Sequence, residues 1–93
     1  MRTIERSTAF KHDYKREAKS RYRATLDDIL VPVLTALAND KPLQSHYRDH
    51  DLSGAWAGYR DCHIKPDLVL IYRKPDAKTL RLARLGSHSE LFG

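Results

Sequence analysis

All four glycines of this 93-residue chain lie beyond residue 53, and this asymmetry divides the sequence into halves of different character. Glycine is unfavourable inside helices and common at turns between strands, so the glycine-free half is the one suited to long helices. No repeat or low-complexity segment interrupts either half. We therefore expect one domain, residues 1–93, with helices first and strands afterwards.

The first half predicts a helical hairpin. Ser7 and Thr8 offer capping hydroxyls, and side chains spaced by four then predict a helix over about residues 8–22: Phe10, Tyr14, Ala18 and Tyr22. A second helix follows from a core-facing pattern: Leu26, Ile29, Leu30, Val33, Leu34 and Leu37. Residues 25–28 resemble a capping box, and Pro32 predicts a kink or a late start. A connection of only a couple of residues would make the helices antiparallel neighbours.

The second half predicts strands. Alternating or apolar runs indicate strands over residues 60–64, 68–73 and 79–85, and a shorter one around residues 55–57 between two glycines. The alternation slips at Ala83 and Arg84, which suggests a bulge. Residues 2–6 could add an edge strand, and the tail from Ser87 has capping-box spacing for one helical turn. The expected fold is α+β, with the N-terminal helical hairpin packed on a small, largely antiparallel sheet.

Composition and charge limit the partners and the cellular location that the chain can be expected to have. Seventeen Lys and Arg against twelve Asp and Glu give a net charge of +5, which favours an acidic partner such as nucleic acid. The longest apolar run, residues 68–72, is far too short to cross a bilayer, and the N-terminus lacks a signal-type apolar core. The lone Cys62 cannot form an internal disulfide and is expected to be a small buried hydrophobe. We expect a soluble cytoplasmic protein without membrane contact.

Histidines supply the candidate chemistry, because imidazole both takes and gives protons near neutrality. Alternation places His63 on the opposite face from Cys62, while Asp67 follows a proline break. His50 precedes the first central strand and His88 follows the last, so hairpin topology can bring these side chains together. Such a set suits metal-free RNA cleavage by the 2′-hydroxyl, with one imidazole as base and another as acid. His12 and His46 are expected to be isolated surface residues.

Cations and aromatic rings offer contacts to RNA. Arg60, Arg81 and Arg84 are the candidates for stabilising charge on the phosphorane. A basic strip on the first predicted helix offers phosphate contacts to a large RNA: Lys11, Lys15, Arg16, Lys19, Arg21 and Arg23. Phe92 could stack on a base, as could Trp56 and Tyr59, although a tryptophan between small residues on a strand is more often core.

Two segments together resemble the YafQ branch of the RelE-type bacterial toxins. They are DHDLSGAWAGYRDCHIKPDLVLIY (residues 49–72) and RLARLGSHSELFG (residues 81–93). The resemblance covers the chain in length and element order, but over the helices it is only a pattern match. It implies the RelE-like microbial ribonuclease fold and a toxin that cuts messenger RNA in the ribosomal decoding site, leaving a cyclic phosphate.

The resemblance also implies site residues and partners. The active-site positions of YafQ-like toxins carry over to His50, His63, Asp67, His88 and Phe92, and Arg84 is favoured over Arg81 as the sheet arginine. We assign His88 as the acid and His50 or His63 as the base. Asp67 is assigned as a carboxylate that orients an imidazole or contacts a base, and Phe92 as a stacking platform. The implied partners are the ribosome, its messenger and a neutralising antitoxin, which a basic toxin predicts to be acidic and partly disordered. Promoter DNA would be bound only through the antitoxin complex.

Three alternatives remain open from the sequence. The same small fold serves ParE-like toxins that act on DNA gyrase, so fold alone does not decide function. A non-catalytic RNA-binding module would share the basic charge. A metal site built from the histidines and Asp67 has suitable ligand types but lacks any short paired spacing, so no metal or other cofactor is expected.

Overall fold

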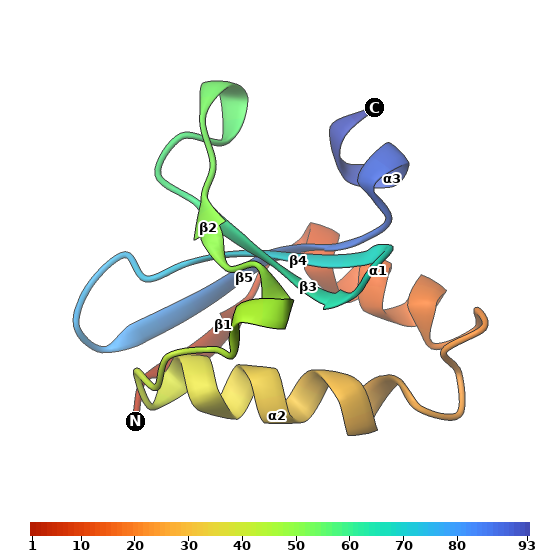
Figure 1. Cartoon of the computed structure of the whole chain (residues 1–93), viewed down its shortest axis with the longest axis horizontal. Coiled ribbons are helices and arrows are strands. Elements are labelled where there is room, and N and C mark those ends of the chain that lie inside the picture. The colour runs from red at the N-terminus through yellow and green to blue at the C-terminus, as the bar shows by residue number, and fades with distance from the viewer.

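The computed structural model describes residues 1–93 as helices packed on a five-stranded sheet (Figure 1). The helices are α1 (Thr8–Glu17), α2 (Leu26–Ala38) and the short α3 (His88–Phe92). The strands are β1 (Thr3–Arg6), β2 (His50–Asp51), β3 (Arg60–Lys65), β4 (Leu68–Arg73) and β5 (Thr79–Gly86). Two single 3₁₀ turns, η1 (Ser45–Tyr47) and η2 (Gly54–Trp56), flank β2.

The sheet order is β1-β5-β4-β3-β2. β1 runs parallel to β5, and every other pair is antiparallel, so the expected α+β fold with a largely antiparallel sheet is confirmed. The expected edge strand is present as β1, and β5 lies between the first and fourth strands. No helix is long and apolar enough to cross a membrane.

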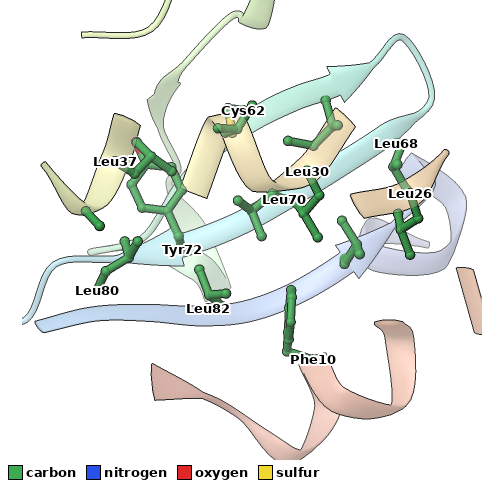
Figure 2. Packing of buried hydrophobic residues seen from close by; sticks show 14 residues of the cluster. Phe10, Leu26, Leu30, Leu37, Cys62, Leu68, Leu70, Tyr72, Leu80 and Leu82 are labelled. Carbon is green, nitrogen blue, oxygen red and sulfur yellow. The ribbon is translucent and has the colours of Figure 1, made fainter. Parts of the chain in front are cut away.

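The main core fills the space between one face of the sheet and the two long helices. Leucines 68 and 70 and Tyr72 of β4 alternate toward this side and meet Leu30 of α2 and Phe10 of α1 (Figure 2). Each of these side chains is at most 2% exposed. Truncating such a residue to alanine typically destabilises a domain by about 2–5 kcal/mol, so this face holds most of the fold's stability.

A smaller core covers the opposite face. Val69, Ile71 and Ala83 point away from the long helices and are covered by Leu91 of α3. In Figure 1, α3 and the η2 segment lie on the side of the sheet away from α2. Trp56 and Tyr59 pack against the same cluster with rings 5.2 Å apart, but both remain half-buried. The candidate site is built on this thinly covered face.

The helical hairpin differs from its predicted form in its connection. α1 ends at Glu17 instead of Tyr22, and residues 18–25 form turns between the helices. The Ser20 hydroxyl donates to the Glu17 carbonyl oxygen at 2.7 Å, which supplies that oxygen with a partner outside the α-helical pattern. Tyr22 still packs on the main core from the turn. The apolar spacing was therefore correct while the helix boundary was wrong.

The second helix starts where its pattern begins. α2 runs from Leu26 through Pro32 to Ala38, so the predicted late start is wrong. The expected capping box is absent as well, because Thr25 makes no side-chain hydrogen bond to the helix. Leu26 and Leu30 are both buried, and this packing holds the turn before the proline in place.

Around the sheet, two local predictions are confirmed and one is wrong. The register shifts between Ile71 and Tyr72 opposite β5, which is the predicted bulge at Ala83. Ser87 caps α3 through the predicted capping box with Glu90. Residues 54–56 form a 3₁₀ turn and not a strand, because Gly54 adopts a φ of 65°, a left-handed conformation that breaks extended backbone.

Candidate active site

Three imidazoles form a row across the thinly covered face of the sheet. β2 pairs with β3 so that His50 lies opposite Asp61, and the alternation of β3 puts Asp61 and His63 on the same face. His88 begins α3 directly after β5. The ring centroid of His63 is 6.4 Å from that of His50 and 5.0 Å from that of His88. The structure therefore brings together the histidines that the sequence singled out.

His50 is held in one tautomer by its backbone partner. Its Nδ1 atom lies 2.7 Å from the carbonyl oxygen of Arg48. A carbonyl oxygen only accepts, so Nδ1 carries the proton in this bond and Nε2 of the neutral ring keeps a free lone pair. Because the ring is exposed, Nε2 is available to a substrate hydroxyl as a proton acceptor.

Asp61 is a site residue that the sequence reasoning missed. Its carboxylate is 3% exposed, and Oδ1 lies 3.0 Å from His50 Nδ1 without a hydrogen bond of suitable geometry. Burial raises the pKa of Asp61, and the neighbouring imidazoles offset part of this rise. In return, the Asp61 carboxylate raises the pKa of His63. The signal for it was present in the sequence, since Asp61 and His63 are two residues apart on one strand.

His63 occupies the middle of the row and is half-buried. Its burial lowers the pKa of the imidazole, and the neighbouring His88 lowers it further, whereas Asp61 raises it. The ring is therefore neutral at neutral pH, which is the form required of a base. The structure leaves both His50 and His63 suited to that role.

Asp67 and His88 are joined by the turn between β3 and β4. The Asp67 carboxylate Oδ1 lies 3.7 Å from His88 Nδ1 and accepts a hydrogen bond of 3.4 Å from the His88 backbone amide. Both side chains are exposed by half or more. The exposed imidazole thus lies beside a carboxylate, and an imidazole that carries a proton can act as a general acid.

Phe92 shares α3 with His88. Their ring centroids are 5.9 Å apart, and the phenylalanine is 43% exposed, one of the few large apolar side chains that remain outside both cores. The helix that carries both rings is held by its capping box and by Leu91, which is buried against the sheet. The position of Phe92 leaves an aromatic face free beside the row of imidazoles.

An ion network on the other side of α3 fixes this helix to α1. Arg16 contacts Glu90 at 3.0 Å and Glu17 at 3.0 Å, and it donates to the Leu85 carbonyl oxygen at 2.9 Å. A β-carbon on Gly86 would lie 2.7 Å from Nη2 of Arg16, so this guanidinium would have to shift if any other residue stood here. Arg16, expected in the basic strip, is instead a structural residue that supports the base of α3.

Arg84 lies in the same network. Its guanidinium donates twice to the buried Asp13, at 2.7 and 3.1 Å, and Asp13 also accepts from the Leu85 amide. Burial alone would raise the pKa of Asp13, but the bonds from Arg84 and Leu85 hold it below its usual value. The structure therefore places Arg84 in an ion pair between α1 and β5, and it makes no contact with an imidazole.

The other predicted RNA contacts lie away from the imidazoles. Arg60 is bonded to Asp49 and Asp51, and Arg81 pairs with Glu5 of the neighbouring strand. Lys11, Lys15 and Lys19 are exposed and form no ion pairs, so their charges face solvent. Cys62 is fully buried, and burial raises the pKa of its thiol, in agreement with its expected role as a hydrophobe.

The metal alternative finds no ready-made site. No group of three His, Cys, Asp or Glu side chains is arranged closely enough to hold a metal ion. The rings of His50 and His88 are both exposed, and each is a neighbour of the His63 ring. The arrangement as it stands supplies proton donors and acceptors.

Comparison with known proteins identifies the family. A family model described as a bacterial toxin of type II toxin-antitoxin system, YafQ, matches residues 2–93. The chain belongs to the YafQ toxin family. The suspected resemblance to YafQ-like toxins is thereby confirmed, and the chain is a toxin of a type II toxin–antitoxin system.

Relatives of this YafQ-family chain are similar over almost their whole length. The mRNA interferase toxin YafQ of Escherichia coli is 40% identical over 92 residues, which cover 97% of this chain and 99% of that protein. A copper-bound mutant toxin from Helicobacter pylori superposes with a TM-score of 0.91 at 38% identity, covering 99% of this chain and 100% of that one. The Escherichia coli DinJ–YafQ complex superposes with a TM-score of 0.86 at 40% identity, covering both chains completely.

Proposed function

We propose that this YafQ-family toxin is a ribosome-dependent endoribonuclease that cleaves messenger RNA in the decoding site. The row of imidazoles, with a carboxylate near each end, carries the proposal. A relative at 40% identity is named an mRNA interferase, which supports the same reaction for this chain.

The reaction requires only proton transfers at the row. Nε2 of His50, or the neutral ring of His63, removes the proton from a ribose 2′-hydroxyl. The oxygen attacks the adjacent phosphorus, the bond from phosphorus to the 5′-oxygen breaks, and His88 donates its proton to that leaving oxygen. The products are a 2′,3′-cyclic phosphate and a 5′-hydroxyl. Asp61 and Asp67 stabilise the imidazolium forms at the two ends, and no metal takes part.

Phosphate contacts outside the row come from free cations. The exposed Lys11, Lys15 and Lys19 lie along one side of α1 and the turn after it, where they can contact ribosomal RNA. Phe92 offers a face for stacking against a base. Arg84 neutralises Asp13 and supports β5, so its contribution to the phosphorane would be electrostatic and at a distance.

The partners follow from the family. A relative forms the DinJ–YafQ toxin–antitoxin complex, and we propose that a cognate antitoxin likewise binds and silences this chain. The net charge of +5 favours an antitoxin segment that is acidic and partly disordered when free. Promoter DNA would be bound by the complex through the antitoxin.

The test is primer-extension mapping of a messenger on programmed bacterial ribosomes. We compare the purified protein with His88→Gln and, as a matched control, with His12→Gln, an exposed histidine of α1 outside the row. Discrete cuts within codons are expected with the native protein and with His12→Gln. Loss of one general acid should slow the cleavage by about 10²–10⁴-fold in His88→Gln.

Three further arms decide the remaining points. Omitting the ribosome should abolish cleavage of the same messenger. Chelating the toxin with EDTA before a magnesium-replenished reaction should leave the rate unchanged, whereas a rate restored only by copper or zinc would show metal dependence. Intact messenger in every arm would overturn the proposal and direct attention to gyrase, which a supercoiling assay with the same protein would test.

A further inference from the structure

A pocket of about 720 Å³ opens beside the row of imidazoles. One wall is formed by His63 and His88 of the row, together with Lys65 at the end of β3. Most of the remaining lining comes from η1 and the residue after it, and from Asp28, Ile29 and Pro32 of α2. Sites for small organic ligands typically occupy about 300–1,000 Å³, so this volume accommodates a nucleotide. The reaction proposed above uses only one edge of it.

The part of the lining that η1 contributes is aromatic. The rings of His46 and Tyr47 lie 4.1 Å apart, and Tyr47 is half-buried against the main core, which fixes the pair in position. His46, expected to be an isolated surface residue, is exposed as predicted but has this stacking partner at the pocket. Aromatic faces of this kind stack on nucleobases with little dependence on sequence.

The polar groups of the pocket suit the rest of a nucleotide. Arg48 and Lys65 are exposed, form no ion pairs and carry the two full positive charges of the lining. Asp28 is the one carboxylate there, and a carboxylate accepts hydrogen bonds from the amino groups of bases. Arg48 also holds His50 through its carbonyl oxygen, so the pocket and the proposed base share a residue.

We infer that this pocket binds a nucleotide of the RNA next to the scissile phosphate. Its base lies against the His46–Tyr47 pair, and its phosphate faces Arg48 and Lys65. The inference rests on the proposed function for its choice of RNA. It adds a second stacking surface to that of Phe92, which does not line this pocket, so that two separate aromatic groups hold the strand near the reacting phosphate.

The probe is a DNA tetranucleotide, which lacks the 2′-hydroxyl and cannot be cleaved by the proposed route. Its binding is followed by two-dimensional NMR on the full chain. We expect shifts in the resonances of His46, Tyr47 and Lys65. A stacked base contributes about 1–3 kcal/mol, so His46→Ala should weaken binding by about 5- to 150-fold. His12→Ala is the matched control and should change binding by less than about twofold.

Two variants separate the base contact from the charge. Tyr47→Phe keeps the ring and the core packing, and it should retain binding. Lys65→Gln should weaken binding of the tetranucleotide and also that of an abasic phosphate backbone of equal length. His46→Ala should affect only the former. Equal effects of His46→Ala on both ligands would overturn the stacking assignment.

The outcomes distinguish this inference from the proposed function. Probe shifts confined to α1 or to Phe92, or an unchanged affinity in His46→Ala, would overturn the pocket even if the protein cleaves messenger. Binding in the pocket by a protein that does not cleave would support the pocket and overturn the nuclease. Cleavage assays with His46→Ala complete the comparison, since the loss should fall mainly on KM and leave kcat for bound RNA within about threefold.

Discussion

His50 and Asp61 face each other across the β2–β3 pair, with His50 Nδ1 3.0 Å from Asp61 Oδ1. The imidazole is exposed and the carboxylate is buried. The carboxylate, which has the higher free-energy cost of desolvation, is therefore the group that has lost its water. Nδ1 donates to Arg48 instead, and Oδ1 has no hydrogen-bond partner. This carboxylate therefore costs stability and acts on the row of imidazoles through its charge.

Replacing Asp61 by asparagine should stabilise the fold and reduce activity. The pKa of Asp61 is raised in the folded state, so the folded chain binds this proton more tightly than the unfolded chain. Ionising the group then opposes folding at all pH values above that pKa. Asp61→Asn should raise the free energy of unfolding by roughly 1 kcal/mol at pH 7, measured by urea denaturation. The gain should vanish below about pH 4, where the native carboxyl is protonated in both states.

The same variant should slow cleavage, because the imidazolium forms lose a nearby negative charge. A decrease of about 10-fold or more in kcat is expected, with Asp51→Asn as the control, an exposed carboxylate of β2. An Asp61→Asn protein that is less stable at pH 7 than the native one would contradict the assignment of an unfavourable buried charge.

His63 should titrate below the ordinary histidine value of about 6.5, because burial and His88 lower its pKa. Histidine side-chain NMR spectra followed against pH measure this directly. In Asp61→Asn the pKa should fall further, since Asp61 is the group that raises it. A pKa that rises in this variant would show that the two side chains do not interact as the structure indicates.

We expect Arg84 to contribute mainly to folding stability and less to the cleavage reaction. Arg84→Ala leaves the Asp13 carboxylate buried with fewer partners, and breaking such a pair typically destabilises a protein by about 3–5 kcal/mol. Asp13 keeps its bonds to Arg16 and the Leu85 amide, so we expect about 2–3 kcal/mol. Arg81→Ala, which breaks the exposed pair with Glu5, should cost less than about 1 kcal/mol.

Thermal and urea unfolding of the two arginine variants decide this prediction. If Arg84→Ala folds with native stability and yet loses activity, the guanidinium acts on the substrate and its bond to Asp13 is incidental. In the native protein, the free energy of unfolding should also fall in acid because of Asp13, whose pKa is lowered in the folded state. That contribution is present above about pH 4 and is lost as pH falls through the folded-state value.

Gly86→Ala should loosen α3. The new β-carbon would lie 2.7 Å from Arg16 Nη2 and 3.0 Å from Glu90 Oε1, so the contacts of Arg16 with Leu85 and Glu90 must shift. Faster hydrogen exchange of the α3 amides and a loss of about 1–2 kcal/mol of stability are expected. In an Arg16→Gln background the side chain is shorter and lacks the Nη2 atom that the new β-carbon would meet. The loss of stability caused by Gly86→Ala should therefore be smaller in that background. Additive effects would contradict the proposed contact.

The sequence predicted the row of imidazoles because strand alternation and hairpin order constrain it. His63 had to lie opposite Cys62, and the ends of β2 and β5 had to approach the same face. Asp61 was missed because it is charged, and a charged residue on a strand is ordinarily exposed. Only the cover given by the neighbouring elements buries it.

The ion pairs and the helix boundary depend on tertiary contacts that periodicity does not report. Arg16 looked like one more cation in a basic strip, and its contacts with Leu85 and Glu90 depend on where β5 ends and α3 begins. Arg84 was favoured through the family resemblance, which says nothing of Asp13 on α1. His46 gave no signal at all, since a loop position next to Tyr47 becomes meaningful only when α2 closes a pocket behind it.

The place of β5 in the sheet links folding to toxicity. Within the sheet, β1 pairs only with β5, so Thr3–Arg6 have no strand partner until residues 79–86 are available. Arg84, the ion-pair partner of Asp13, also belongs to β5, and His88 follows directly after this strand. A growing chain therefore cannot complete its row of imidazoles before residues 79–88 are available. Under the proposed function, the chain therefore gains its activity only with its last strand and the helix that follows it.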